Sequence, residues 1–306
     1  MRKIFLALSG TLKRRHNNNT LPVISTLISA IFWGLLWWPL KFFATDGLTG
    51  NLIGMTAYAM VGIFALPIVW HQRKLWREEW VLLVLIGLFF AVANITFTTA
   101  LIQGEVVRVM LLFYLLPVWG ALGGVLVLGE KLEKKRCIAI TLSLSGVFII
   151  MGGDSILSQP FSMVDMMALV AGFCLSATGV INKLAVKIPM ASRSFVPFIF
   201  CPLLAALANQ IAPAPMPELS MMTWGLLACF AFLWIFGATL LGTYGQANIE
   251  ASKVSILQVT ELFVAIISAV FIGGEILEMK EYIGGALIVI ATLLETFEIK
   301  ALNKYA

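Results

Sequence analysis

The chain has 306 residues, of which 60% are hydrophobic and only 12% are charged. Ordinary globular domains carry about twice that share of charged residues, so the composition excludes a soluble domain and indicates an integral membrane protein. The net charge of +5 comes from basic residues in short loops between apolar runs, where cytoplasmic retention explains them, so we expect no nucleic-acid partner.

A basic N-terminal arm, residues 1–20, precedes a series of apolar runs. Its apolar core, Ile4–Leu8, is too short for a signal peptide, so we expect the arm to stay in the cytoplasm or on the membrane surface. A helix needs about 20 apolar residues to cross a bilayer. Runs of roughly this length lie near 22–43, 50–70, 80–101, 105–128, 136–152, 163–186, 194–211, 221–243, 252–273 and 281–299. The sequence therefore predicts an all-α membrane protein with ten transmembrane helices.

One of these stretches occurs twice. The segment from Glu105 to Arg136 returns as a degenerate copy that begins at Glu250, at a constant offset of 145 residues. Each copy carries Gly-Glu-x-Leu near its end, at 129–132 and at 274–277, and another apolar run follows each copy. The duplication predicts two five-helix repeats, residues 21–152 and 163–299.

The loops after the two copies differ in charge. Residues 130–136 include four basic and two acidic residues, whereas residues 275–281 include one basic and three acidic residues. Because basic short loops stay in the cytoplasm, we expect the copies to cross the membrane in opposite senses, as in the inverted repeats of secondary transporters. With the N-terminus inside, 18 of the 21 Lys and Arg residues fall on the cytoplasmic side, which predicts that both termini are cytoplasmic.

Short motifs connect the chain to a known family. They are Trp33-Gly34 with Lys41 eight residues after the Trp, Leu116-Pro117, and the two Gly-Glu-x-Leu segments. In these motifs the chain resembles, from about Leu21 to Ile299, the EamA family of the drug/metabolite transporter superfamily. The second half departs from the pattern, with Leu262 in place of Pro117 and Ala171-Gly172 in place of Trp33-Gly34. The resemblance implies a carrier of small metabolites, often an exporter, in a bacterial inner membrane. It also implies a central cavity lined largely by helices 1, 3, 4, 6, 8 and 9.

Ionisable side chains inside the spans are candidates for a binding site, because burying them in hydrocarbon is costly. Glu261 lies midway along the ninth span, on one helical face with Gln258, Ala265 and Ser268. We favour a cavity-lining Glu261 that meets a substrate amine, a cation or a coupling proton. The alternative is a structural hydrogen bond between helices.

Two basic residues enter the spans from the predicted outer side, Arg108 at the start of the fourth and Lys41 at the end of the first. Two interpretations stay open for each of them. The side chain either binds a substrate carboxylate or snorkels to lipid phosphate.

Neutral side chains complete the predicted lining. Asn94 and Tyr244 lie on small, polar faces of the third and eighth spans, although such faces also serve close helix packing. Trp37 shares a helical face with Lys41, and Tyr114 lies in the fourth span, where aromatic residues are otherwise core or lipid-facing. The predicted substrate-binding residues are Lys41, Trp37, Asn94, Arg108, Tyr114, Tyr244, Gln258 and Glu261.

No enzyme chemistry is expected. The two histidines fall in loops, the four cysteines are widely spaced, and the glycine pairs lack the Lys and Ser or Thr of a phosphate loop. We therefore predict no cofactor, metal or ATP coupling. The favoured function is export of a small amphipathic metabolite, such as an amino acid or a derivative, by a monomeric or weakly dimeric carrier with the proton as candidate coupling ion. A multidrug exporter of cationic xenobiotics and a non-transporting sensor or assembly protein are the alternatives.

The charge reversal between the copies predicts a topology. Cysteine labelling or reporter fusions should place both termini and residues 130–136 in the cytoplasm, and residues 275–281 outside, because only the first loop is basic. If both loops label from the same side of the membrane, the halves are not inverted.

Overall fold

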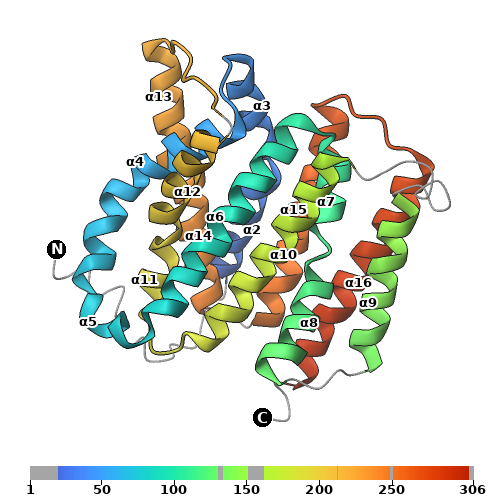
Figure 1. The fold of residues 1–306 in the computed structure, drawn as a ribbon. Coiled ribbons are helices and arrows are strands. Elements are labelled where there is room, and N and C mark those ends of the chain that lie inside the picture. Colours follow the sequence, from blue (N-terminus) through green and yellow to red (C-terminus); the bar gives the residue numbers. More distant parts are fainter. Residues whose placement is uncertain (1–19, 130–133, 151–161, 212, 249–250, 303–306) are drawn as a thin grey trace.

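The computed structural model describes residues 20–129, 134–150, 162–211, 213–248 and 251–302, which fold as a bundle of helices (Figure 1). The first half consists of α2 (Thr20–Gly34) and α3 (Trp37–Thr45), α4 (Gly50–His71), α5 (Arg73–Trp76), a 3₁₀ turn η1 (Arg77–Glu79) and α6 (Trp80–Gln103), α7 (Val106–Phe113) and α8 (Leu116–Leu128), and α9 (Lys134–Ile150). The second half consists of α10 (Met163–Leu184), α11 (Met190–Phe195) and α12 (Pro197–Ile211), α13 (Met221–Cys229), a π-helix η3 (Phe230–Phe236) and α14 (Gly237–Asn248), α15 (Ala251–Phe271), and α16 (Met279–Leu302).

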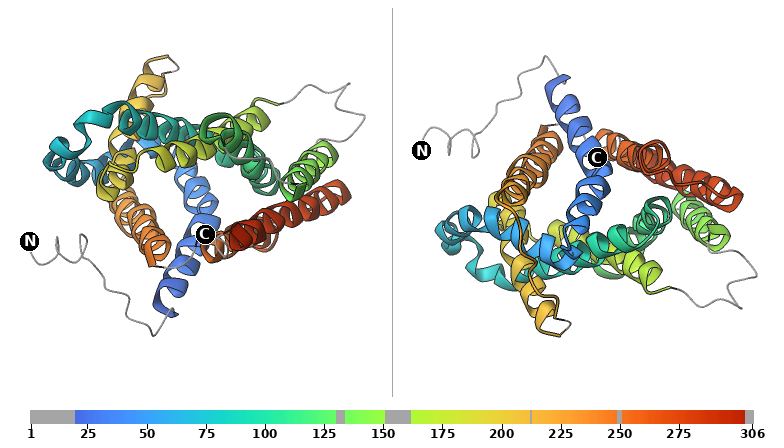
Figure 2. Two further views of the ribbon diagram at one scale, coloured as in Figure 1. Left: turned by 90° about the horizontal axis from the view of Figure 1, so that it is seen from below. Right: turned by 90° about the horizontal axis from the view of Figure 1, so that it is seen from above.

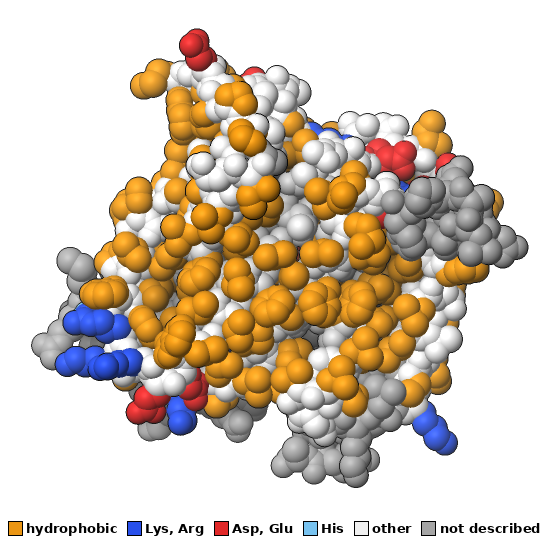
Figure 3. Space-filling view, in the orientation of Figure 1, with side chains coloured by type: hydrophobic (Ala, Val, Ile, Leu, Met, Phe, Trp, Pro, Cys, Tyr) orange, Lys and Arg blue, Asp and Glu red, His pale blue; other side chains and the backbone are white. Residues whose placement is uncertain are grey.

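Within the described residues these elements form ten long helical rods, several of which consist of two or more consecutive helices. Their apolar surface suits a bilayer. Seven segments are long and apolar enough to cross a membrane: Thr20–Thr45, Gly50–His71, Arg73–Gln103, Val106–Leu128, Met163–Leu184, Met190–Ile211 and Met221–Gly245. Shorter apolar helices cover Cys137–Ile150 and Leu257–Phe271. On the face drawn in Figure 3, hydrophobic side chains form a broad band and the charged side chains gather toward its two ends. The prediction of an all-helical membrane protein with ten helices is confirmed.

The two copies of the repeated segment run in opposite directions. The backbone N–H of Val106, at the start of α7, lies 2.7 Å from Oε1 of Glu275, which follows the end of α15. The beginning of one copy therefore meets the end of the other, as an inverted repeat requires. The Gly of each Gly-Glu-x-Leu motif has left-handed backbone angles, with φ +68° at Gly129 and +70° at Gly274, so both copies end in the same type of turn.

Helix packing also respects this duplication (Figure 2). Helix α9 packs along α16, and α4 packs along α12, so each of these pairs joins equivalent helices of the two halves. Helix α2 packs on α14 and α15, just as its counterpart α10 packs on α6 and on α7–α8. Exchanging the two halves thus preserves the main contacts.

Two predicted spans are interrupted by proline. The spans predicted at 22–43 and 105–128 are each divided in the structure, between Gly34 and Trp37 and between Phe113 and Leu116. Pro117 has no N–H to offer the carbonyl of Phe113, four residues earlier. Pro39 stands in the same relation to Leu35, whose carbonyl instead accepts from the N–H of Trp38 at 3.1 Å.

The carbonyls released by proline lie against glycines of neighbouring helices. A Cβ added at Gly172 of α10 would stand 2.6 Å from the carbonyl oxygen of Phe113. Pro202 of α12 likewise releases Phe198, and a Cβ at Gly62 of α4 would stand 2.5 Å from that carbonyl oxygen. Only glycine permits such an approach, which brings a Cα–H group to an oxygen that has lost its helical donor.

Gly34, the counterpart of Gly172 in the first half, lies in the same way against the carbonyl oxygen of Glu261, at 2.6 Å from an added Cβ. In each half, therefore, one glycine lets its helix cross closely over the repeated segment of the other half. These two crossings hold α2 on α15 and α10 on α7.

Replacing this glycine should destabilise the bundle. Gly172→Ala forces the backbone of α10 away from Phe113 and should cost about 1–3 kcal/mol of stability, read as a lower melting temperature in detergent. Gly179→Ala in the same helix is the matched control, because no atom lies within 4 Å of an added Cβ there. The control should be neutral or stabilising by up to about 1 kcal/mol. Equal melting temperatures for the two variants would contradict the close crossing.

Candidate functional site

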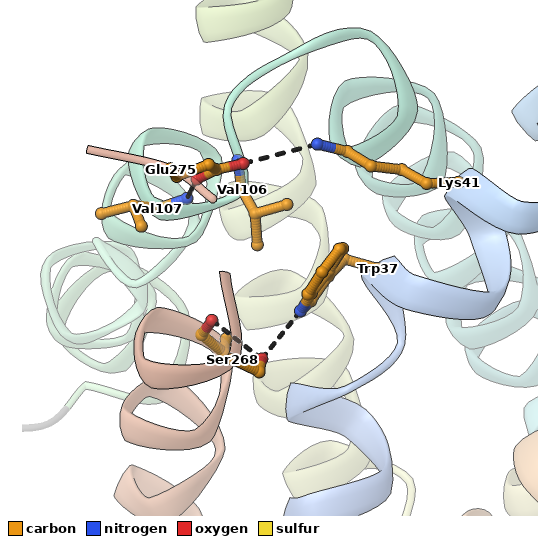
Figure 4. Close-up of polar contacts among 7 residues, drawn as sticks. Trp37, Lys41, Val106, Val107, Ser268 and Glu275 are labelled. Carbon is orange, nitrogen blue, oxygen red and sulfur yellow. Dashed lines mark hydrogen bonds and ion pairs between the residues drawn. The ribbon is translucent and has the colours of Figure 1, made fainter. Parts of the chain in front are cut away.

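The carboxylate of Glu275 joins three segments at one end of the bundle (Figure 4). Its oxygens accept hydrogen bonds from the backbone N–H groups of Val106, at 2.7 Å, and Val107, at 3.0 Å, in the first turn of α7. Oε1 also lies 3.4 Å from Nζ of Lys41, in the middle of α3. We call Glu275, Lys41 and these two amides the Glu275 cluster. It connects α3 and the segment after α15 to the start of α7.

The amide contacts contribute more to this cluster than the ion pair does. A carboxylate at a helix N-terminus combines charge-assisted hydrogen bonds with the helix dipole, together stabilising by about 1–2 kcal/mol. The Lys41 pair is longer, and the Lys41 side chain is 36% exposed, so its contribution is at most about 1 kcal/mol. Glu275 is thus chiefly a cap of α7 that Lys41 reinforces.

Trp37 lies beneath the cluster and fixes α3 to α15. The indole is 4% exposed, and its Nε1 donates to Oγ of Ser268 at 2.9 Å. Nζ of Lys41 lies 5.7 Å from the centre of the Trp37 ring, within reach of a cation–π contact. The predicted common face of Trp37 and Lys41 therefore turns toward α15 and Glu275.

Arg108 is engaged by a partner that the sequence analysis did not identify. Its Nε lies 2.8 Å from Oδ1 of Asp165, and its NH2 nitrogen lies 3.1 Å from Oδ2, so the pair is bidentate. The Asp165 side chain is only 4% exposed and also closes a capping box with Ser162 at the start of α10. The sequence signal was the Ser162-x-x-Asp165 spacing before an apolar run. A substrate carboxylate that used this same Nε and NH2 edge of Arg108 would have to replace Asp165.

Glu261 lies halfway along α15 and is hydrogen-bonded by the hydroxyl of Tyr114, at the break between α7 and α8. The same hydroxyl is 3.4 Å from the carbonyl oxygen of Gln258. Among the described residues Glu261 forms no salt bridge, in contrast to Glu275 and Asp165. The acidic group in the middle of the bundle is therefore held by a neutral donor.

The remaining predicted residues occupy separate places. Asn94 of α6 is 8% exposed and donates to the hydroxyl of Tyr58 in α4 at 2.8 Å. Tyr244 of α14 is 40% exposed, and the Gln258 side chain is also exposed. The structure thus brings Tyr114 to Glu261, and Trp37 and Lys41 to one another, but it leaves Tyr244 and Gln258 open to the surroundings.

Comparison with known proteins gives the chain a context. The profile of the EamA-like transporter family matches residues 20–152 and 162–297. The uncharacterized transporter YojE of Bacillus subtilis (strain 168) is 25% identical over 296 residues, which cover 92% of this chain and 96% of YojE. A protein of known crystal structure superposes with a TM-score of 0.60 over 93% of this chain and 98% of its own, at 17% identity, which shows the fold alone.

Removing the Glu275 charge should open this end of the bundle. In a variant without the four native cysteines, a Cys at the buried Ser268 reports access below the cluster. Glu275→Gln loses the ion pair and the charged cap, so labelling by a membrane-impermeant maleimide should accelerate about 5- to 30-fold, the effect of 1–2 kcal/mol on an equilibrium.

The matched control is Glu278→Gln, since Glu278 is a nearby exposed carboxylate that pairs with Lys280 at 2.6 Å. Labelling in this control should stay at the parent rate. If both variants label like the parent, the Glu275 cluster does not restrict access from this end.

Proposed function

Because this chain belongs to the EamA-like transporter family, we propose that it is a secondary carrier that moves small amphipathic metabolites across the membrane by alternating access. The chain is a multi-pass membrane protein and a transporter rather than an enzyme. The substrate class that we propose is an amino acid or an amino-acid derivative, and the direction is export. The observation that carries this proposal is the Tyr114–Glu261 pair halfway through the bundle.

The chemistry of Glu261 favours a ligand that brings positive charge. An ionised carboxylate at the centre of a membrane helix costs roughly 2.5–3.5 kcal/mol, so it is retained where a partner or a function compensates. Tyr114 donates one hydrogen bond but no charge. A substrate ammonium group or a proton would neutralise Glu261, and release of either would restore the charge. This exchange is what coupling in a carrier requires.

Arg108 and Lys41 support alternating access in a different way from direct substrate binding. The Arg108–Asp165 and Glu275–Lys41 pairs lie at the same end of the bundle, because Val106 and Arg108 belong to the first turn of α7. Together they connect α3, α7, α10 and α15. Opening a path to the centre from this end would separate these helices, so we propose that the pairs break and re-form during transport.

Charge distribution supports an outward-facing position for this end. The described basic residues at the opposite end are Arg73, Lys74, Arg77, Lys134, Lys183, Lys187 and Arg193. Cytoplasmic loops are enriched in Lys and Arg, so we propose that the opposite end and both termini face the cytoplasm. In that orientation the Glu275 cluster closes the external side.

A second candidate cargo follows from the same pair. Glu261 forms no salt bridge to a described basic residue, and a lone carboxylate surrounded by apolar helices also suits organic cations. Proteoliposome transport of a panel of amino acids beside tetraphenylphosphonium separates the two classes. Accumulation of the organic cation alone would favour the xenobiotic exporter.

The central test is Glu261→Gln, which keeps the shape and the hydrogen bond with Tyr114 but cannot change charge. Gradient-driven accumulation in proteoliposomes should fall to background, whereas exchange of substrate for substrate should survive, since exchange need not release the proton. Glu278→Gln, a change of the same kind at an exposed position, should transport like the parent. Accumulation against a gradient by Glu261→Gln at the parent rate would exclude Glu261 as the coupling site.

A further inference from the structure

Asn94 and Tyr58 form a buried polar pair between α6 and α4. Asn94 is 8% exposed and Tyr58 is 2% exposed, and Nδ2 of Asn94 lies 2.8 Å from the Tyr58 hydroxyl. Oδ1 of Asn94 is fully enclosed and has no hydrogen-bond partner among the described residues. Native proteins seldom leave a buried carbonyl oxygen without a donor. The pair therefore has an unused capacity to bind a polar group.

The same amide borders a small cavity. Its volume is about 10 Å³, close to the least that holds one water-sized group. Leu36 and Leu40 of the α2–α3 rod form one wall, and Phe230 and Ile235 of η3 form another. These walls are apolar, so the polar contacts available in the cavity come chiefly from the Asn94–Tyr58 pair.

The hydrogen-bond donor and acceptor that the pair leaves unused define the chemistry of its ligand. If the Asn94 amide donates to Tyr58, its Oδ1 can accept and the Tyr58 hydroxyl can donate. If the amide is turned over, its Nδ2 can donate and the Tyr58 oxygen can accept. In either orientation the cavity presents one donor and one acceptor. A hydroxyl group, which also has one donor and acceptor lone pairs, matches this arrangement, whereas a methyl group does not.

Thr98, the other hydroxyl-bearing side chain of the lining beside Tyr58, does not compete for the ligand. Its Oγ1 donates to the backbone carbonyl of Asn94 at 2.8 Å, within α6. The aromatic ring of Tyr58 is stacked on Phe198 of α12, with centroids 5.3 Å apart, so the phenol is held in place. The binding groups are thus positioned before any ligand arrives.

Both walls of the cavity are irregular helices. Leu36 lies in the break between α2 and α3, and Leu40 follows Pro39. The other wall is a π-helical segment of seven residues, a rare conformation that occurs frequently at functional sites. Transporters commonly build substrate sites at discontinuous helices. Helix α3 also carries Trp37, which binds Ser268 of α15, so a displacement of α3 would alter this cavity and the Glu275 cluster together.

We propose that the Asn94–Tyr58 pair is the binding subsite for one hydroxyl group of the transported molecule. The inference rests on the proposed function and narrows its substrate class to hydroxyl-bearing amino acids or derivatives. The hydroxyl donates to the free acceptor of the pair and accepts from its free donor. Because the cavity holds no more than one water-sized group, binding of the remainder of the molecule requires the α3 wall, Leu36 and Leu40, to move away from the pair.

The test compares ligands that differ by a single hydroxyl. The probes are L-serine against L-alanine and L-threonine against L-2-aminobutyrate, with apparent Kd taken from the ligand-dependent rise in melting temperature of the purified protein. The parent should bind the hydroxylated member of at least one pair about tenfold or more tightly than the other member. The reason is that the ligand without the hydroxyl leaves the buried polar groups of Asn94 and Tyr58 unpaired. Asn94→Leu and Tyr58→Phe should bring both members within about twofold of each other.

Thr96→Val is the matched control. Thr96 lies in the same helix, and its hydroxyl is bonded to the carbonyl of Val92 at 2.8 Å, so this variant should discriminate like the parent. The inference is overturned if the parent discriminates neither pair, or if Asn94→Leu keeps the parent's discrimination, in which case the cavity serves water only. Transport in proteoliposomes separates this failure from failure of the proposed function. Equal accumulation of both members would leave the proposed amino-acid substrate class standing, whereas accumulation of no member of either pair would remove that class.

Discussion

One end of this bundle is organised around the carboxylate of Glu275. It accepts from the first amides of α7 and lies beside Lys41, so three helices that are far apart in the chain meet at one acidic group. The turn that presents it depends on Gly274 in a left-handed conformation. Because α7 and α15 are inverted copies of one segment, the contact also places the end of one copy at the start of the other. The proposed gate and the duplication therefore rest on the same interaction.

The interior of the bundle depends on a second device, proline opposite glycine. Pro117 and Pro202 each release one helical carbonyl, and Gly172 and Gly62 let a neighbouring helix approach that oxygen. The close crossing compensates for the helical donor that each carbonyl has lost, since an exposed carbonyl in hydrocarbon is costly. The Pro117 break also places Tyr114 at the end of α7, where its hydroxyl reaches Glu261. The proline break that permits this close packing therefore also positions Tyr114 and Glu261, the polar pair at the centre of the proposed pathway.

The fold was largely predictable from the sequence, whereas the partners of the candidate site residues were not. Span length, the 145-residue offset and the Gly-Glu-x-Leu motifs suffice for ten helices in two halves. Helical periodicity also placed Glu261 and Ser268 on one face, which does meet Tyr114 and Trp37. Pairing across the bundle carries no local signal: Asp165 lies 57 residues from Arg108, and Tyr58 lies 36 from Asn94. The sequence also gives no signal for the π-helix η3, since this segment contains no proline.

The central claim is that the Glu275 carboxylate keeps this end closed and that the carrier alternates between closed and open forms. Spin labels at Thr45, the last residue of α3, and Met279, the first residue of α16, span the cluster at exposed positions. Electron paramagnetic resonance distances in lipid nanodiscs should show two populations in the parent, with the longer one dominant in Glu275→Gln. A single distance distribution that Glu275→Gln leaves unchanged would contradict the account.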